Sequence, residues 1–177
     1  MRAESISTVV SFVTLIVVAT ASVAAIVQLH HLRTSNQLNG MLEIMNQWNI
    51  PAVQQALAEV QRIPEKMEDP EYARVLLTHH AMDRANYPEL LAMDLWEQIG
   101  TFSKRGLIDE SILLDITSDQ VLNAWRDAHP AIAAVRQKRG LSMYENFEYL
   151  AVRATLWNRR YPGGTYPAGL PRMSDLT

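Results

Sequence analysis

The chain has 177 residues, a formal net charge of −3 and 48% hydrophobic residues, and it contains no cysteine. The lack of cysteine excludes disulfides, zinc–thiolate sites, iron–sulfur clusters and cysteine nucleophiles. Residues 34–119 carry a net charge of −8 and residues 120–177 a net charge of +4. The eight basic residues of the second segment are scattered and too few for a nucleic-acid binding surface. They could face anionic lipid, an acidic protein surface or solvent.

The first feature along the chain is an apolar run, Ile6–Val27, without charge, glycine or proline. As a helix rising 1.5 Å per residue it is about 33 Å long, enough to cross a hydrocarbon core of about 30 Å. The run is too long for the apolar core of a cleaved signal, and a helical pattern continues beyond it. We therefore expect a single-pass membrane anchor over residues 1–32, with the following domain on the cytoplasmic side, where basic residues meet the anionic leaflet.

Small residues fall on one face of this anchor helix, at steps of four and three residues. Such a face lets another helix approach closely in lipid, although small residues are also common elsewhere in the segment. No histidine lies within the span, since His30 and His31 fall at the water interface, so we expect no haem, chlorophyll or other cofactor. The face consists of Ser7, Ser11, Thr14, Val18, Ala21 and Ala25.

Prolines divide the region after the anchor into separate predicted helices. Helical spacing predicts that the first helix continues as an amphipathic stalk to about Trp48, and that Pro51 ends it and opens a second helix. Pro64 ends the apolar stripe of the second helix. The run Asp69-Pro70-Glu71 provides an N-cap, a first-turn proline and a favourable acid for a third helix, which we expect to reach about Arg84.

Five more helical segments are predicted from capping and stop signals. Tyr87-Pro88-Glu89 starts one that stops at Gly106. Asp109 caps a short helix, and the run 117–120 has capping-box spacing for the next. Pro130 starts or kinks a further segment that ends at Gly140. A second capping box, Ser142 with Glu145, opens the last helix, which runs to about Trp157.

Beyond Trp157 the chain is rich in proline and glycine, which prevents a continuous helix. A disordered tail is the plain interpretation, but the aromatic residues suit an extended arm that lies on a partner. The expected interface residues of this arm are Trp157, Tyr161, Tyr166 and Leu170. The fold class is therefore all-α, with an anchor (1–32), a small helical-bundle domain (33–157) and an extended arm (158–177).

No catalytic, cofactor-binding or metal-binding constellation is apparent. His79 and Asp83 lie one helical turn apart but lack a third ligand, and no Glu-x-x-His or His-Glu-x-x-His pattern occurs. Gly163-Gly164 lacks the setting of a phosphate loop. We expect that the protein is not an enzyme, the alternative being one that uses His79, Asp83 or Arg136.

A set of short motifs stands in a fixed order between residues 96 and 151. In sequence they are Trp96-Glu97-Gln98-Ile99-Gly100, Gly106-Leu107-Ile108-Asp109, Trp125, Pro130-Ala131-Ile132 with Arg136, Tyr144, and Phe147-Glu148-Tyr149-Leu150-Ala151. Their order and spacing resemble the bacterial family catalogued as domain of unknown function 4760. The resemblance implies a membrane segment followed by a small helical domain, hence a bacterial inner-membrane protein, and implies no activity.

These motif residues suit packing. Trp125, Tyr144 and Phe147 are large apolar side chains for a core, and Arg136 with Glu148 can pair between helices.

The functional expectation is a non-catalytic accessory subunit of a larger membrane protein complex, such as a photosynthetic reaction centre with its antenna or another energy-converting assembly. Its expected partners are other subunits of that complex and the lipid bilayer, with no nucleic acid and no small-molecule substrate. The alternative is a membrane-tethered sensor or regulator whose helical domain binds a ligand or a signalling partner.

Overall fold

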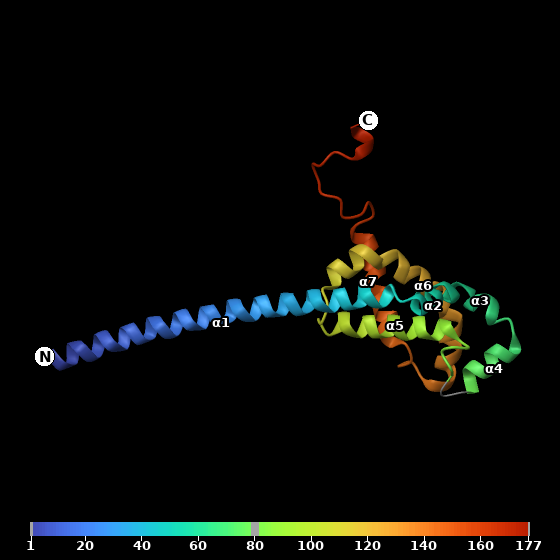
Figure 1. The fold of residues 1–177 in the computed structure, drawn as a ribbon, viewed down its shortest axis with the longest axis horizontal. Coiled ribbons are helices and arrows are strands. Elements are labelled where there is room, and N and C mark those ends of the chain that lie inside the picture. Colours follow the sequence, from blue (N-terminus) through green and yellow to red (C-terminus); the bar gives the residue numbers. More distant parts are fainter. Residues whose placement is uncertain (1, 79–81, 177) are drawn as a thin grey trace.

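The computed structural model describes residues 2–78 and 82–176, with side chains for Thr8 and from Val10 onward. The regular structure in this part of the chain is entirely helical, which confirms the all-α class (Figure 1). The helices are α1 (Arg2–Trp48), α2 (Pro51–Glu59), α3 (Ile63–Lys66), α4 (Pro70–Thr78), α5 (Pro88–Lys104), α6 (Glu110–Arg139) and α7 (Glu145–Arg160), with short 3₁₀ turns η1 (Val60–Arg62) and η2 (Met173–Asp175).

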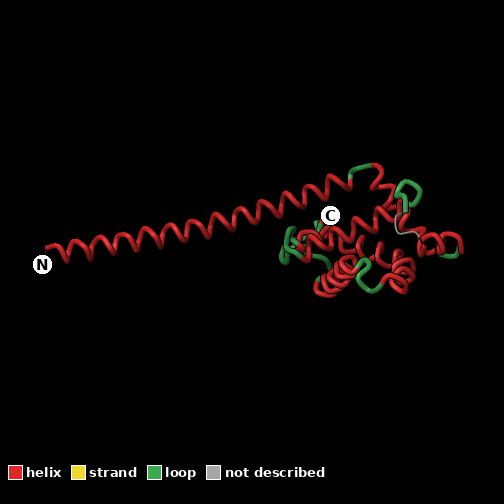
Figure 2. Tube along the Cα trace, turned by 90° about the horizontal axis from the view of Figure 1, so that it is seen from below, coloured by secondary structure: helices red, strands yellow, loops and turns green. Residues whose placement is uncertain are grey.

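Helix α1 is one uninterrupted helix of 47 residues. This confirms the prediction that the apolar span continues into a stalk, because the first proline is Pro51, in the opening turn of α2. Most of α1 projects away from the remaining helices (Figures 1 and 2). Its last turns join them: Met41 and Ile44 are buried, and Gln37 Nε2 donates a hydrogen bond to Gly106 O at 3.1 Å.

The core of the bundle lies where α5 packs against both α2 and α7, and α7 against α6. Trp96 and Phe147 stack there with ring centroids 6.1 Å apart, and Trp48 and Trp125 pack edge-on against Trp96 and Phe147. Trp96 and Phe147 are almost completely buried. Large aromatic side chains bury much apolar area, so this cluster contributes substantially to the stability of the bundle.

Helix α6 corrects the prediction of separate helices around residues 117–120 and Pro130. The structure has one helix of 30 residues, with Pro130 inside it. Thr117 does not cap a helix, because its buried hydroxyl donates to Leu113 O at 2.7 Å within α6. Proline removes one helical hydrogen bond, but Ala131 and Ile132 are fully buried beside it, so packing outweighs the loss. The predicted stop at Gly140 is confirmed by its φ of 93°.

Two other predicted boundaries are wrong. The described part of α4 is Pro70–Thr78, and residues 82–86 are not helical, so the helix does not reach Arg84. Residues 83–87 form a turn instead, in which Asp83 accepts hydrogen bonds from the Ala85 backbone N–H and the Asn86 side chain. Pro64 does not end helical structure either, since it lies in the first turn of α3. Short polar side chains compete with the helix by such local hydrogen bonds, which helical periodicity does not reveal.

Candidate interaction surfaces

The apolar part of α1 is uncovered along its whole length. It is the helix in the described part of the chain that is long and apolar enough to cross a membrane, and none of its most apolar window is buried against the rest of the protein. The predicted face residues Ser11, Thr14, Ala21 and Ala25 are all exposed. The side chain of Ser7 lies outside the described residues.

Polar side chains within this apolar helix satisfy their own hydrogen bonds. The hydroxyls of Thr14, Thr20 and Ser22 each donate to the backbone carbonyl four residues earlier, at 2.8 Å. An unpaired hydroxyl in hydrocarbon is costly. These three hydroxyls are therefore compatible with a lipid environment.

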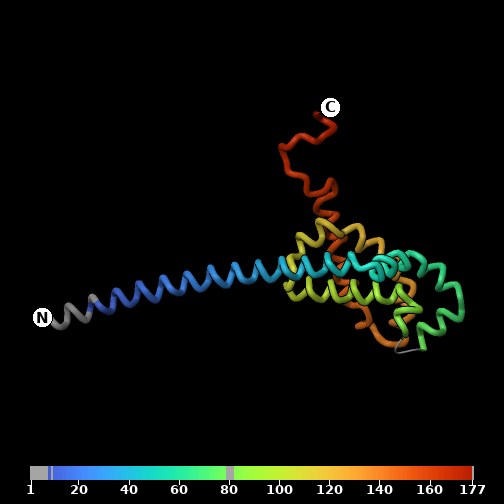
Figure 3. The backbone as a smooth tube through the Cα atoms, viewed as in Figure 1, coloured from blue at the N-terminus to red at the C-terminus, as the bar shows by residue number. Residues whose placement is uncertain are grey.

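At the opposite end of the chain, α7 leads into the proline-rich segment. The Trp157 and Tyr161 rings lie 4.6 Å apart at the end of α7, and both are half-buried. The segment then rises away from the bundle (Figures 1 and 3). Of the four predicted arm residues, these two form its base, while Tyr166 and Leu170 lie further out and are exposed.

The segment from residue 162 to 176, called the arm below, is held by its own polar contacts. Tyr166 OH donates to Pro171 O at 2.9 Å, and the Arg172 guanidinium lies 4.4 Å from the Tyr166 ring centroid. The Thr165 hydroxyl donates to Asp115 on α6. These contacts leave apolar side chains in solvent, with Leu170 58% and Met173 75% exposed.

The N-terminus of α7 is capped by a side chain from α5. Glu97 accepts hydrogen bonds from the backbone N–H groups of Asn146 (3.0 Å) and Phe147 (2.8 Å), and from the Asn146 amide (2.7 Å). The predicted capping box of Ser142 and Glu145 is wrong, because Tyr144 is the N-cap residue and has a left-handed φ of 55°. A carboxylate suits this position, since a helix N-terminus carries unpaired N–H groups and positive partial charge.

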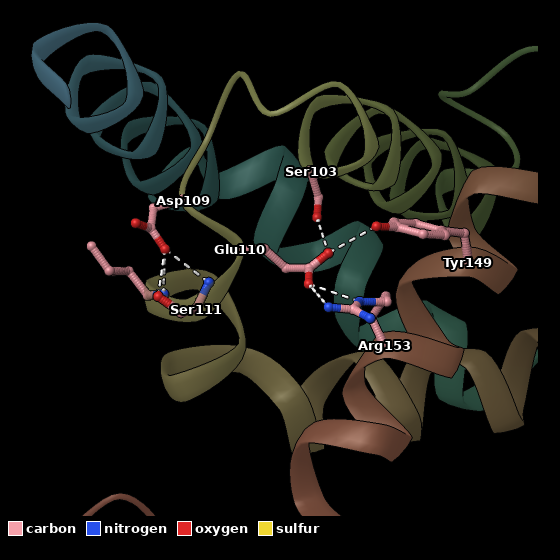
Figure 4. Close-up of polar contacts among 7 residues, drawn as sticks. Ser103, Asp109, Glu110, Ser111, Tyr149 and Arg153 are labelled. Atoms are coloured by element: carbon pink, nitrogen blue, oxygen red, sulfur yellow. Dashed lines mark hydrogen bonds and ion pairs between the residues drawn. The ribbon is translucent and has the colours of Figure 1, made fainter. Parts of the chain in front are cut away.

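Glu110 joins three helices at the start of α6 (Figure 4). Its carboxylate accepts hydrogen bonds from Ser103 on α5 (2.9 Å) and from Tyr149 (2.9 Å) and Arg153 (2.7 Å) on α7. Burial alone would raise the pKa of Glu110, but the bonds from Arg153, Ser103 and Tyr149 outweigh it and lower that pKa. Asp109, one residue earlier, caps α6 as predicted by accepting from the backbone N–H groups of Ser111 and Ile112.

A second acidic centre, Glu89, lies fully buried at the start of α5. It accepts from Tyr72 OH at 2.8 Å and from Lys66 Nζ at 2.9 Å, and Lys66 also pairs with Glu59 at 2.9 Å. Burial and the neighbouring Glu89 carboxylate raise the pKa of Tyr72, so its hydroxyl stays protonated and donates. Sequence reasoning missed this cluster and that of Glu110, because their members lie far apart in the chain.

The predicted pairing of Arg136 with Glu148 is confirmed. Their side chains form an ion pair at 2.7 Å, in which Arg136 is mostly buried and Glu148 about half exposed. Arg136 also donates to the backbone carbonyls of Met143 (2.8 Å) and Tyr144 (3.2 Å) and lies over the Trp125 ring. The arginine therefore fastens the turn between α6 and α7, which is a structural role.

A hollow with a volume of about 440 Å³ lies between α2 and α6. Trp48, Leu57 and Trp96 contribute apolar walls, and amide side chains such as Gln54 and Asn123 contribute polar ones. The buried indole Nε1 atoms of Trp48 and Trp96 have no hydrogen-bond partner in the described part of the chain. The hollow is therefore lined by both apolar and hydrogen-bonding side chains.

Among residues 2–78 and 82–176, no group of three or more His, Asp or Glu side chains could hold a metal ion. His79 lies outside the described residues, and Asp83 belongs to the turn before α5.

One family model matches this chain, over residues 15–154, and its description reads Domain of unknown function (DUF4760). The match includes most of α1 and ends within α7. No curated protein and no solved structure matches the chain. The matched segment contains the Trp96–Gly100 and Phe147–Ala151 motifs, whose residues form the contact between α5 and α7 described above.

Proposed function

Because the chain belongs to the DUF4760 family, whose description gives no activity, we propose a function from its surfaces: it is a non-catalytic accessory subunit of a larger membrane protein complex. Helix α1 crosses the membrane and packs against neighbouring subunits. The arm binds a second site on the same complex. The helical bundle between them sets the separation of the two contacts.

The observation that carries this proposal is the uncovered apolar length of α1. None of its most apolar window is buried by the chain itself. Lipid or other proteins must therefore remove that apolar surface from water. A simple tether would need only the span, yet α1 is continuous with a stalk that is built into the core through Met41 and Ile44. This rigid connection suits a subunit that positions its domain.

The arm supports the same proposal from the other end of the chain. Its own hydrogen bonds fix its course, while Leu170 and Met173 stay in solvent. Exposed apolar side chains on an ordered segment are typical of a surface that another protein covers. Three carboxylates support a non-catalytic role, since the fully buried Glu89 and the partly exposed Glu97 and Glu110 each join neighbouring helices.

The test is isolation of the tagged full-length chain from its native membranes in mild detergent. We expect it to elute in one large complex at fixed stoichiometry. Replacing Tyr166 and Leu170 with alanine should release it from that complex while it stays in the membrane fraction, and the control Gln98→Ala should not. A natural chain that elutes alone, or a substituted chain that stays in the complex, contradicts the proposal.

A membrane-tethered sensor is the second candidate, and the hollow beside Trp48 and Trp96 favours it. In that case the isolated chain would be free of a large complex, and a small-molecule extract of the source cells would raise its Tm. Ala58→Trp, which places a bulky side chain in the hollow, should abolish the shift. The proposed host class, an energy-converting assembly, stays a prediction from the sequence.

A further inference from the structure

The stalk of α1 carries an apolar stripe on the side that the bundle leaves uncovered. Leu38, Leu42 and Met45 are 56%, 50% and 44% exposed, whereas Met41 and Ile44 between them are buried. The bundle therefore covers one face of the stalk, as Figure 2 shows by placing it along one side of the helix. Three large apolar side chains that follow one another along an exposed helix face are typical of a surface that another molecule covers.

The spacing of the stripe identifies the partner as another helix. Steps of four and three residues give an average repeat of 3.5, which is the pattern of a two-stranded coiled coil. Counting back in sevens from Leu42 gives Ser35, Gln28, Ala21 and Thr14, and from Leu38 gives His31, Ala24 and Val17. The repeat is therefore polar between residues 28 and 35 and small or apolar again within the span. A straight helix drifts about 20° per heptad from such a repeat, and a left-handed supercoil removes the drift.

Charge and size along this repeat suit an identical helix. Between Ser5 and Asn49 the charged residues are Arg33 and Glu43, and neither belongs to the repeat. Thr14 and Ala21 are small enough for close approach in lipid. Gln28, His31 and Ser35 are the polar residues of this repeat, and in a parallel, in-register pair each would lie opposite its own counterpart.

We propose that two copies of this chain pair through α1 in a parallel, in-register coiled coil, in contact outside the membrane through Leu38, Leu42 and Met45. The inference rests on the membrane span proposed above, because two copies inserted the same way have parallel α1 helices at the same depth. Each residue of the stripe then meets its own counterpart. A different partner helix would have no reason to place identical residues opposite each other.

The absence of cysteine makes this geometry directly measurable. Because this chain has no other cysteine, a disulfide-linked dimer of Leu38→Cys, Leu42→Cys or Met45→Cys joins the same residue of two copies, at Cα separations of about 4.4–6.8 Å. Asn36→Cys and Glu43→Cys are matched controls, because both residues are exposed on the same stalk but lie off the stripe. All five side chains are exposed, so these substitutions leave the core intact.

The experiment oxidises each full-length variant in its membranes and measures the disulfide-linked dimer on a non-reducing gel. We expect at least several-fold more dimer at the three stripe positions than at the two controls. Equal yields at all five positions, or no dimer at any of them, would overturn the pairing. Carbonate extraction of the same membranes separates the two proposals: release of the chain refutes the span and the pairing together, whereas a retained chain without dimer refutes the pairing alone.

Discussion

Glu97 on α5 holds Asn146 at the first turn of α7, accepting hydrogen bonds from its backbone N–H at 3.0 Å and from its side-chain amide at 2.7 Å. The same carboxylate accepts from the Phe147 backbone N–H. One side chain thus replaces the local cap that α7 lacks. The position of α7 on α5, and with it the aromatic core, depends on this contact.

Removal of the Glu97 carboxylate should therefore loosen α7. We expect Glu97→Ala to lower the free energy of unfolding by about 2 kcal/mol, because two backbone N–H groups lose a charged acceptor. Glu97→Gln should cost less, since one carbonyl acceptor remains. Urea denaturation of the detergent-solubilised chain, followed by tryptophan fluorescence, measures both. The exposed neighbour Gln98→Ala is the control, and an equal loss there would contradict the capping role.

Gly100 is the point of closest approach between α5 and α7. A methyl group added there would lie 2.0 Å from Asn146 O, a distance that requires the helices to move apart. Overpacking of this kind costs about 3 kcal/mol, the upper end of its usual range. We expect Gly100→Ala to lower the Tm strongly or to prevent folding. Gly163→Ala has open space around the new methyl group, and its Tm should stay unchanged.

Acid should weaken the contact among α5, α6 and α7 through Glu110. Its pKa in the folded chain is below the ordinary value of 4.5, so the ionised carboxylate contributes stability above pH 4.5 that is lost as the pH falls through the folded pKa. At pH 7 we expect Glu110→Gln to be less stable than the natural chain by about 1–2 kcal/mol, allowing for partial exposure.

The pH dependence itself is the check on Glu110. The difference in unfolding free energy between the natural chain and Glu110→Gln should shrink as the pH falls below 4.5, measured by urea denaturation at a series of pH values. Glu65→Gln is the control, because the Glu65 side chain is exposed and makes no ion pair or side-chain hydrogen bond in the described part of the chain. A constant difference across the series would refute the linkage.

Arg136 should matter more than its partner Glu148. Arg136 bonds two backbone carbonyls of the turn in which Tyr144 has a positive φ, while Glu148 is about half exposed. We expect Arg136→Ala to cost about 2–3 kcal/mol and Glu148→Ala about 1 kcal/mol or less. A double-mutant cycle on unfolding free energies should give a coupling below about 1 kcal/mol. A larger coupling would show that the ion pair, and not the backbone contacts, carries the effect.

The motif residues show why part of the site was predictable. Gly106 and Gly140, which both follow basic residues, correctly predicted the ends of α5 and α6. A glycine with a positive φ ends a helix by a local property of the chain, which can be recognised in the sequence. Pairing of Arg136 with Glu148 was also predicted, since both charges belong to elements expected to pack. The clusters of Glu89 and Glu110 were not, because each partner alone resembles an ordinary surface residue.

The sequence by itself determined the all-α class, the apolar span within α1, the start of α2 at Pro51 and the cap of α6 at Asp109, because hydrophobic periodicity, proline and short-range capping act within a few residues. Only the tertiary structure decided that α6 passes through Thr117 and Pro130 and that Glu97 caps α7. These outcomes depend on burial and on contacts between residues about fifty positions apart, where packing outweighs local preference.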